Sequence, residues 1–332
     1  MNDYLWLLLG FAILIVGGDM LVRNAVKVAE YLRVPYTVIG VVLLGFGTSA
    51  PELVTSIQAA KAGSPGIAVG NFVGSNITNV LLVLGFAATI APFKLLDLDT
   101  KRDGYIMFAS AVLFTVMAQI WPLDQLAGAI LLAMLVGYIT MTIRSAQTSR
   151  EVLGEENLLA LNAQVTPAQQ KKVGYVEPAV TTSFGTSALA FMLTLVGLLG
   201  IIVGSDFLVH AAIDIANDLG VSQSVIGVSV VALGTSLPEL VAVTFAALKG
   251  RGDMALGGII GSNIYNTLMI GGVTGLIAPN FVPADIASYD VFVMVAASTA
   301  LLIIACTGQR LRRYEGLGLL SAYGIYIYSI WP

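Results

Sequence analysis

The stretch "GTSAPE", residues 47–52, lies inside the apolar run "VIGVVLLGFGTSAPELVTSIQAA" that extends from residue 38 to residue 60. The run is long enough to cross a membrane, yet it contains a proline followed directly by a glutamate. An ionised carboxylate at the centre of a bilayer costs several kcal/mol of free energy. The same arrangement returns in "GTSLPE", residues 234–239. We therefore interpret Glu52 and Glu239 as candidate functional residues.

The composition indicates a membrane protein. Of the 332 residues, 57% are hydrophobic and 11% are charged, whereas soluble domains have about 25% charged residues. Apolar windows of roughly 18 to 25 residues recur along the chain, which is the length that a helix needs to cross the hydrocarbon layer. The sequence thus predicts an all-α polytopic membrane protein. Its single cysteine, Cys306, excludes a disulfide framework within the chain.

Ten transmembrane helices are predicted, at residues 4–22, 36–60, 66–91, 105–121, 124–143, 184–208, 223–248, 255–277, 289–306 and 317–331. The loops between them alternate in charge, because 15 of the 16 basic residues fall in odd-numbered loops and only Lys61 falls on the other side. Basic loops mark the cytoplasmic side of a membrane protein. We therefore expect an integral membrane protein with both termini outside.

The two halves of the chain are repeats of each other. Position n in the first half matches position n+187 in the second without a gap, and 23 of 48 positions are identical over residues 38–85. We divide the chain into a first five-helix repeat (1–143), a cytoplasmic connector loop (144–183) and a second five-helix repeat (184–332). Five is an odd number of crossings, so the two repeats must be inverted. Inverted repeats around a midplane site are typical of secondary transporters with alternating access.

The prolines explain how a carboxylate can be useful at this depth. Pro51 has no N–H, so the carbonyl group of Gly47, four residues earlier, loses its helical partner. Pro238 acts in the same way on Gly234. Freed carbonyl oxygens then lie close to each glutamate. Irregular backbone of this kind is tolerated inside a membrane only where it is buried in protein or lines a wet cavity.

A second pair of motifs supplies more oxygen atoms. The stretch "GNFVGSNITN" (70–79) returns as "GGIIGSNIYN" (257–266), with glycines spaced to let helices approach closely. Together the motifs give ten candidate cation ligands, namely Glu52, Glu239, Thr48, Thr235, Ser49, Ser236, Ser75, Ser262, Asn79 and Asn266. All ten offer oxygen, which suits hard cations such as Ca²⁺ and Na⁺, whereas zinc or copper would favour nitrogen or sulfur ligands.

The motifs "GTSAPEL", "GSNITN", "GTSLPEL" and "GSNIYN" resemble those of the calcium/cation antiporter superfamily, and specifically of prokaryotic sodium/calcium exchangers. The resemblance covers the whole chain. It implies that the second, third, seventh and eighth helices enclose Na⁺ and Ca²⁺ sites in which Glu52 and Glu239 are shared ligands. It also implies electrogenic exchange of Na⁺ for Ca²⁺, with the first and sixth helices sliding across the core.

The resemblance also bears on cofactors and partners. Some relatives, including potassium-dependent ones, carry Asp where this chain has Asn266, so the neutral side chain disfavours a K⁺ requirement. Ca²⁺ and Na⁺ are expected as transported substrates rather than as bound cofactors, and no cofactor is expected. The resemblance implies a prokaryotic plasma or inner membrane, with membrane lipid as the expected surroundings, and neither nucleic acid nor an obligate protein partner is expected.

Two other functions fit part of this pattern. A Ca²⁺/H⁺ antiporter on the same fold is the alternative, because intramembrane glutamates can carry protons. The proton-coupled relatives have a "GNAAE"-like motif, which is absent from this chain. An intramembrane hydrolase using Ser49 or Ser236 would need a nearby base, and the only histidine, His210, lies near a predicted helix end. We therefore predict a transporter and not an enzyme.

Charged pairs also occur on the first and sixth predicted helices. Asp19 and Arg23 are spaced i, i+4, as are Asp206 and His210. They are either a gate or proton-sensitive latch on mobile helices, or ordinary ion pairs at helix ends. We favour the second interpretation, because exposed ion pairs contribute little on their own.

Overall fold

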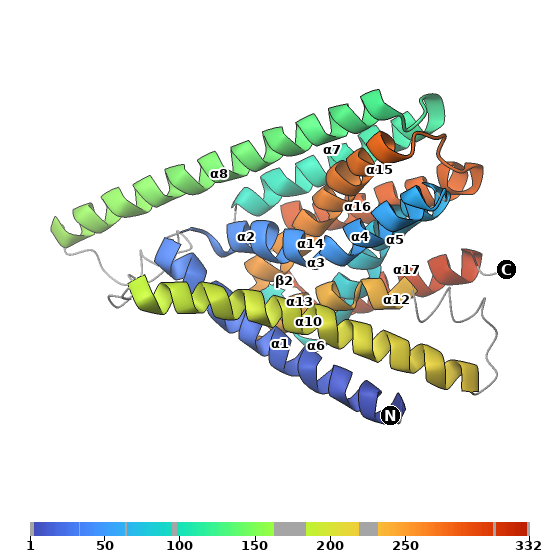
Figure 1. The fold of residues 1–332 in the computed structure, drawn as a ribbon. Helices are drawn as coiled ribbons and strands as arrows, with labels where there is room; N and C mark the ends of the chain where they lie inside the picture. The colour runs from blue at the N-terminus through green and yellow to red at the C-terminus, as the bar shows by residue number, and fades with distance from the viewer. Residues whose placement is uncertain are drawn as a thin grey trace.

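The computed structural model describes residues 3–32, 34–63, 65–94, 98–162, 184–218, 232–307 and 310–330, and helices account for most of them. The helices form one elongated bundle (Figure 1). In this view α8 (Gln125–Asn162) lies at one edge, and α1 (Asp3–Leu32) and α10 (Phe184–Asp218) lie at the opposite edge. The first turn of α1 and the last turn of α17 (Arg313–Ile330) are at the same end of the bundle.

Helices of the first half are interrupted by π-helical turns, which are labelled η. After α1 come α2 (Tyr36–Ile39), η1 (Gly40–Gly45), α3 (Phe46–Thr48), α4 (Ala50–Lys61), α5 (Pro65–Thr78), η2 (Asn79–Leu84), α6 (Gly85–Ile90), the short strand β1 (Phe93–Lys94), α7 (Leu98–Ile120) and α8. Elements that follow one another without a gap, such as α5, η2 and α6, form one continuous helical segment.

The second half begins with α10 and repeats much of this order. It continues with α12 (Ala232–Thr235), α13 (Leu237–Leu248), α14 (Gly252–Tyr265), η4 (Asn266–Ile270), α15 (Gly271–Ile277), η5 (Ile286–Asp290), α16 (Val291–Thr307), β2 (Arg310–Leu311) and α17. The turns η2 and η4 begin at Asn79 and Asn266, which are counterparts at the spacing of 187. The repeat in the sequence is thus matched by a repeated irregularity in the backbone.

Seven of the described helical segments are long and apolar enough to cross a membrane. They are Asp3–Leu32, Tyr36–Lys61, Gly66–Ile90, Lys101–Ile120, Gln125–Gln147, Ser187–Ala211 and Ile286–Cys306. Each overlaps one of the ten predicted transmembrane helices. The predicted helix at 223–248 lies partly outside the described residues, and those at 255–277 and 317–331 overlap α14–α15 and α17. The chain is a helical membrane protein, and the count of ten crossings stays a prediction.

Several helices extend beyond the ranges predicted for them. α1 ends at Leu32 instead of residue 22, α10 ends at Asp218 instead of residue 208, and α7 begins at Leu98 instead of residue 105. These predicted boundaries were wrong because hydropathy detects where an apolar run ends. A helix ends where its backbone hydrogen bonds are interrupted, and α1 continues through polar residues until shortly before Pro35.

The helix α8 also continues past its predicted end at residue 143, and it reaches Asn162. The first part of the segment 144–183, which we expected to be a connector loop, is therefore helical. Residues 163–183 lie outside the described part of the chain.

Reciprocal glycine contacts hold α1 against α10. A Cβ atom added at Gly17 would lie 3.0 Å from the carbonyl oxygen of Gly197, and one added at Gly10 would lie 2.9 Å from that of Gly204. Gly10 and Gly197 are counterparts in the repeat, and so are Gly17 and Gly204. The two contacts are therefore one contact made twice, as in an interface around a two-fold axis. Small residues allow such close approach of helices in membranes.

Glycines of the motif "GGIIGSNIYN" pack closely as well. A Cβ atom added at Gly257 would lie 2.7 Å from the carbonyl oxygen of Thr37, and one added at Gly261 would lie 2.8 Å from that of Val41. The corresponding glycines of the first motif meet no backbone atom this closely among the described residues. Positions 224 and 228, the counterparts of residues 37 and 41, lie outside those residues, so close packing of the first motif stays a prediction.

Short strand pairings join loops at two places. β1 pairs antiparallel with β2, with Phe93 opposite Leu311, and Leu123 forms an isolated antiparallel bridge with Asn280. Phe93 and Asn280 are counterparts in the repeat. The first pairing joins the loops predicted as the third and ninth, and the second joins those predicted as the fourth and eighth. Each pairing therefore joins two loops that were predicted to share one side of the membrane.

Gly197→Ala is expected to push α10 away from α1. The added Cβ would lie 2.6 Å from the backbone nitrogen of Leu21, and overpacking of this kind lowers the free energy of unfolding by about 1–3 kcal/mol. Thermal unfolding in detergent should therefore show a lower Tm. The matched control is Gly200→Ala on the same helix, whose Cβ would have its nearest neighbour at an ordinary 3.5 Å. Equal losses in both variants would contradict the importance of the glycine contact.

Candidate functional site

Both candidate glutamates follow a break in a helix. The break between α3 and α4 is at Ser49, with φ −80° and ψ 2°, and the break between α12 and α13 is at Ser236, with φ −93° and ψ 5°. Each break comes two residues before a proline, which has no N–H to continue the hydrogen bonds of the preceding turn. The proline then lies in the first turn of the new helix, where a missing N–H costs little.

Glu52 and Glu239 lie in the first turns of α4 and α13, and each is only 1% exposed. A helix N-terminus carries a partial positive charge that favours a carboxylate. The carboxylate oxygens of both residues nevertheless have no hydrogen-bond partner among the described residues. The two carboxylates are close enough for their charges to interact. Burial of two like charges without protein partners leaves a large cost that a bound cation would offset.

Hydroxyl groups of the first half lie beside the glutamate of the second half. Thr48 and Ser49 are buried next to the Glu239 carboxylate, without forming a regular hydrogen bond to it. Thr48 Oγ1 instead donates to the carbonyl oxygen of Leu44 at 2.8 Å and lies 3.4 Å from the Oγ of Ser262. The two halves of the chain therefore contribute jointly to the surroundings of the carboxylates.

The remaining hydroxyl residues divide into buried and accessible ones. Ser236 is buried, and its Oγ has no hydrogen-bond partner in the described part of the chain. Ser75 and Ser262 are buried on α5 and α14, and Ser262 Oγ donates to the carbonyl oxygen of Gly45 at 3.2 Å. Thr235 is half-buried and lines a cavity. Access to the candidate site is therefore unequal on its two sides.

Asn79 and Asn266 are the first residues of the π turns η2 and η4. Single π turns within α-helices are frequent at functional sites. Both side chains are buried. The Nδ2 of Asn79 donates to the Oδ1 of Asn263 at 3.1 Å, and its own Oδ1 has no partner among the described residues. Neither amide atom of Asn266 has a hydrogen-bond partner in that part of the chain.

The elements that carry these residues pack across the two halves. α4, which carries Glu52, contacts η4, and α13, which carries Glu239, contacts η2. The four motifs therefore gather on neighbouring elements. Within the described ranges no three His, Cys, Asp or Glu side chains form a cluster that could hold a metal ion. Any cation bound here would thus use two carboxylates together with neutral oxygen atoms.

Three asparagines beside the candidate ligands were missed by sequence reasoning. Asn71 Nδ2 donates to the backbone carbonyl oxygen of Glu52 at 3.1 Å. The side chain of Asn263 donates a hydrogen bond to the backbone carbonyl oxygen of Asn76, across the two halves. These two are identical counterparts in the repeat, so the alignment of the halves already contained the signal that could have found them. Asn71 corresponds to Gly258, and no repeat signal marks it.

A cavity of about 190 Å³ opens beside the second helix break. It is lined by Pro51, Thr55, Ile202, Ser205, Asp206, Val209, Gly234, Thr235 and Pro238. Its charged residue, Asp206, has a side chain that is 62% exposed. The cavity reaches both prolines that precede the glutamates, so it adjoins both helix breaks.

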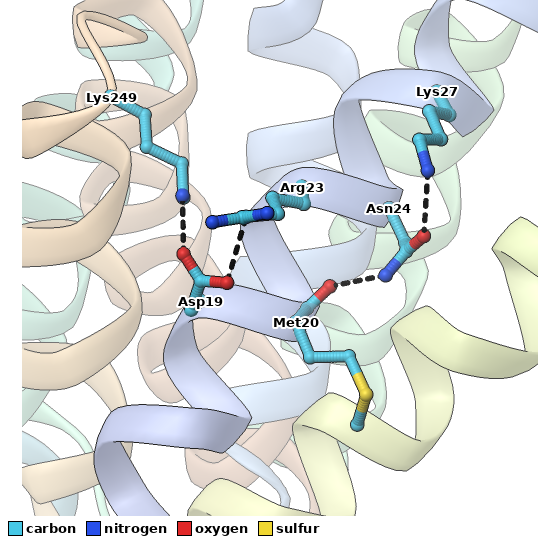
Figure 2. A network of polar contacts seen from close by, with 6 residues as sticks. All are labelled: Asp19, Met20, Arg23, Asn24, Lys27 and Lys249. Atoms are coloured by element: carbon cyan, nitrogen blue, oxygen red, sulfur yellow. Dashed lines mark hydrogen bonds and ion pairs between the residues drawn. The ribbon is translucent and has the colours of Figure 1, made fainter.

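The counterpart of Asp206 is Asp19 on α1, and two cationic side chains bind it (Figure 2). One carboxylate oxygen lies 2.7 Å from the Nε of Arg23 on the same helix. The other is paired with the Nζ of Lys249, at the end of α13. Figure 2 shows Lys249 reaching the carboxylate from a different helix. Asp19 thus links α1 to the helix that carries Glu239.

The Asp206 end has a different arrangement. Asp206 pairs at 3.4 Å with His210 on its own helix. The position that corresponds to Lys249 is Ala62, which cannot form an ion pair. Both i, i+4 pairs expected from the sequence are therefore present, but among the described residues only the Asp19 pair extends to a second helix.

A second tie joins the end of α1 to the turn between α13 and α14. Glu30 lies 3.9 Å from an Nη of Arg251 and accepts a hydrogen bond from the hydroxyl of Tyr36 at 3.2 Å. The guanidinium of Arg251 also lies 4.3 Å from the centre of the Tyr36 ring, within the range of a cation–π contact. Arg251 of the second half therefore contacts both Glu30 at the end of α1 and Tyr36 at the start of α2.

A helical membrane bundle with buried acidic side chains beside broken helices has the architecture of an ion transporter. The comparison with known families supports this class. The family model described as "Sodium/calcium exchanger protein" matches residues 3–144 and 189–331. The chain belongs to the sodium/calcium exchanger family, which is a family of transporters and not of enzymes.

Individual relatives agree with this assignment. The chain is 36% identical over 348 residues to the sodium/calcium exchanger MaX1 of Methanosarcina acetivorans, with 98% of this chain and 97% of the relative covered. It is 25% identical over 293 residues to the Ca²⁺/H⁺ antiporter ChaA of Bacillus subtilis, with 83% and 78% covered. A solved structure of the sodium-calcium exchanger NCX_Mj matches with a TM-score of 0.82, 28% identity and 99% of both chains covered.

Glu52→Gln is expected to stabilise the cation-free protein and to abolish its response to Ca²⁺. The variant removes a buried charge that has no partner among the described residues, and such a charge destabilises a folded protein by about 3–5 kcal/mol. In the unmodified protein, Ca²⁺ at a hundred times its Kd should add about 2.7 kcal/mol to the free energy of unfolding. Thermal unfolding in detergent, with a chelator and then with Ca²⁺, measures both effects.

The control for this experiment is Asp285→Asn, which neutralises an exposed carboxylate that belongs to none of the four motifs. It should alter neither the Tm in chelator nor the Ca²⁺ response. A Glu52→Gln variant that retains the full Ca²⁺-dependent rise in Tm would remove Glu52 from the candidate ligands.

Proposed function

We propose that this protein is a secondary active antiporter that exchanges Na⁺ for Ca²⁺ across the membrane by alternating access. The observation that carries the proposal is the group of buried oxygen atoms at Ser49, Glu52, Asn79, Ser236, Glu239 and Asn266, which lack hydrogen-bond partners among the described residues. Buried polar atoms normally have partners, so a shared deficit at matching positions of two repeats indicates a missing ligand. Carboxylate, amide and hydroxyl oxygens suit hard cations.

The ions bind between the two repeats. Glu52 and Glu239 are shared by Ca²⁺ and Na⁺, and the neutral oxygens come from Thr48, Thr235, Ser49, Ser236, Ser75, Ser262, Asn79 and Asn266. The carbonyl groups freed by the two prolines add to this set, because a helix that ends at a break directs its last carbonyl oxygens outward.

The topology is two inverted repeats of five transmembrane helices, at 1–143 and 184–332, joined by a cytoplasmic connector at 144–183. The reciprocal contacts of Gly10 with Gly204 and of Gly17 with Gly197 support this symmetry. Both termini face outside, because the odd-numbered loops hold nearly all the basic residues. The pairing of β1 with β2 is consistent with this orientation, since it joins two odd-numbered loops.

Competition for the two glutamates couples the two ion flows. Ca²⁺ balances the two negative charges, so Ca²⁺ and Na⁺ cannot occupy the same carboxylates together. An empty site would leave both charges buried without compensation, which is unfavourable in an apolar interior. The site therefore changes the side to which it opens only when it holds an ion. Transport of one ion in one direction thus requires the other ion to be carried in the opposite direction.

Access alternates between an Asp206 side and an Asp19 side. The cavity beside Asp206 supplies the open route in this conformation, and the ion pair of Asp19 with Lys249 closes the opposite route. Under the predicted topology, Asp206 faces outside and Asp19 faces the cytoplasm. The reverse conformation requires Asp19 to release Lys249, so that the cavity forms around the counterpart residues of the first repeat.

A Ca²⁺/H⁺ antiporter remains the second candidate. Its support is the similarity to ChaA, at 25% identity over 83% of this chain, together with glutamates that could carry protons. The greater identity to MaX1 and the absence of a "GNAAE"-like motif favour Na⁺ as the coupling ion.

Uptake of radioactive Ca²⁺ into proteoliposomes tests the function. Vesicles loaded with Na⁺ and diluted into Na⁺-free buffer, at equal pH on both sides, are expected to accumulate Ca²⁺. Vesicles loaded with choline should not. Glu52→Ala and Glu239→Ala should each reduce uptake to background, because either change removes a charge that both ions need. Uptake that ignores Na⁺ but follows an imposed pH gradient would transfer the assignment to the Ca²⁺/H⁺ antiporter.

Lys249→Gln is expected to expose the Asp19 side of the site. Val22 is fully buried and is the counterpart of Val209, which lines the open cavity. In a protein with Cys306 replaced by Ala, Val22→Cys should react faster with a membrane-impermeant maleimide when Lys249→Gln is present. Loss of an ion pair worth about 0.5–1 kcal/mol predicts a two- to fivefold effect. Val209→Cys is the control, and faster labelling at both positions would indicate general loosening instead.

A further inference from the structure

The two asparagines missed by sequence reasoning form a bridge between the repeats. Asn76 on α5 and Asn263 on α14 are counterparts, and their side chains are 2% and 1% exposed. Each follows a candidate ligand serine directly and precedes a candidate ligand asparagine by three residues. Buried amides in these positions can direct the groups around them, because each offers two donor hydrogens and one acceptor oxygen.

The bonds of Asn263 determine which atom of Asn79 is free. The Nδ2 of Asn263 donates to the backbone carbonyl oxygen of Asn76 at 3.2 Å. A carbonyl oxygen can only accept, so the orientation of the Asn263 amide is fixed and its Oδ1 must be an acceptor. That Oδ1 accepts from the Nδ2 of Asn79 at 3.1 Å. The Oδ1 of Asn79, buried and without a partner among the described residues, is therefore the atom left to face a cation.

If the two repeats were fully symmetric, Asn76 would orient Asn266 in the same way, but Asn76 does not bond to Asn266. The Nδ2 of Asn76 donates at 2.8 Å to the Oγ1 of Thr267, and it also lies 3.4 Å from the Sδ of Met294. The Oδ1 of Asn76 and both amide atoms of Asn266 have no hydrogen-bond partner within the described ranges. Thr267 is the counterpart of Val80, which has no hydroxyl. One hydroxyl group thus takes the bond of Asn76 and interrupts the symmetry at this point.

We propose that Asn263 is a positioning residue that presents the Asn79 carbonyl oxygen to the transported cation, and that Thr267 withholds the same support from Asn266. The inference rests on the proposed function, since it assumes that Asn79 and Asn266 are cation ligands. It makes the site unequal, with one amide fixed in advance and the other free to turn. A preoriented oxygen binds a cation without paying rotational entropy at the moment of binding.

The first experiment is a double-mutant cycle between Asn79 and Asn263, with Na⁺-dependent Ca²⁺ exchange as the readout. Asn263→Leu keeps the approximate volume and removes both hydrogen bonds, so the KM for Ca²⁺ should rise about five- to tenfold, as for the loss of a hydrogen bond. The maximal rate should change much less. Because Asn263 acts through Asn79, adding Asn263→Leu to Asn79→Leu should cause no further rise in KM.

The cycle distinguishes a failure of the ligand role of Asn79 from a failure of the positioning role of Asn263. An Asn79→Leu variant with an unchanged KM would show that Asn79 is not a ligand, and it would overturn this part of the proposed function. A raised KM in Asn79→Leu that rises further by the full factor on adding Asn263→Leu would overturn only the positioning role. The matched variant at the counterpart, Asn76→Leu, should raise the KM less, because Asn76 does not hold Asn266.

The second experiment tests the hydroxyl that interrupts the symmetry. Thr267→Val installs the residue found at the counterpart position, so Asn76 should be freed to orient Asn266 and the KM for Ca²⁺ should fall. Thr267→Ser keeps the hydroxyl and should leave the KM as it is. A rise in KM for Thr267→Val, of the size seen for Asn263→Leu, would overturn the role assigned to Thr267. A Tm measured in chelator for each variant shows whether folding was affected.

Discussion

Two buried carboxylates, without hydrogen-bond partners among the described residues, are the constraint on which the rest of the structure depends. Such a pair is costly in an apolar interior, and the surrounding elements reduce that cost only in part. Each carboxylate lies in the first turn of a helix that begins after a break, where the helix dipole favours negative charge. A bound cation would offset the remaining cost, whereas enclosing the two carboxylates without one would be unfavourable.

The internal symmetry gives the site its two-sided character. Helix breaks at Ser49 and Ser236, π turns that start at Asn79 and Asn266, and reciprocal glycine contacts between α1 and α10 are each made twice. In the proposed inverted topology, the two copies could exchange their conformations at little net cost, because each copy would adopt the arrangement that the other gives up. This provides the physical basis for alternating access in transporters with inverted repeats.

Departures from the symmetry make the two repeats unequal. Lys249 binds Asp19 on one side, whereas Ala62 leaves Asp206 beside an open cavity on the other. Thr267 accepts a hydrogen bond from Asn76, whereas its counterpart Val80 has no hydroxyl group. Asn263 instead accepts a hydrogen bond from Asn79. Both departures depend on a single polar group that is present in one repeat and absent from the other. Single substitutions after duplication are enough to bias an equilibrium between two packed arrangements, since an interaction worth about 1 kcal/mol changes a population about fivefold.

The sequence by itself determined the membrane class, the repeat at a spacing of 187 and the positions of the two glutamates and their prolines. These features follow from hydropathy, from residue identity between the two halves and from the missing N–H of proline, and none of them depends on how the chain packs. It did not locate the ends of α1 and α10, since the end of an apolar run and the end of a helix have different causes. Only the tertiary structure decided that Asn263 bonds to Asn79 while Asn76 turns to Thr267, and that Lys249 reaches Asp19. These contacts join residues far apart in the chain, and their geometry depends on how the two repeats pack.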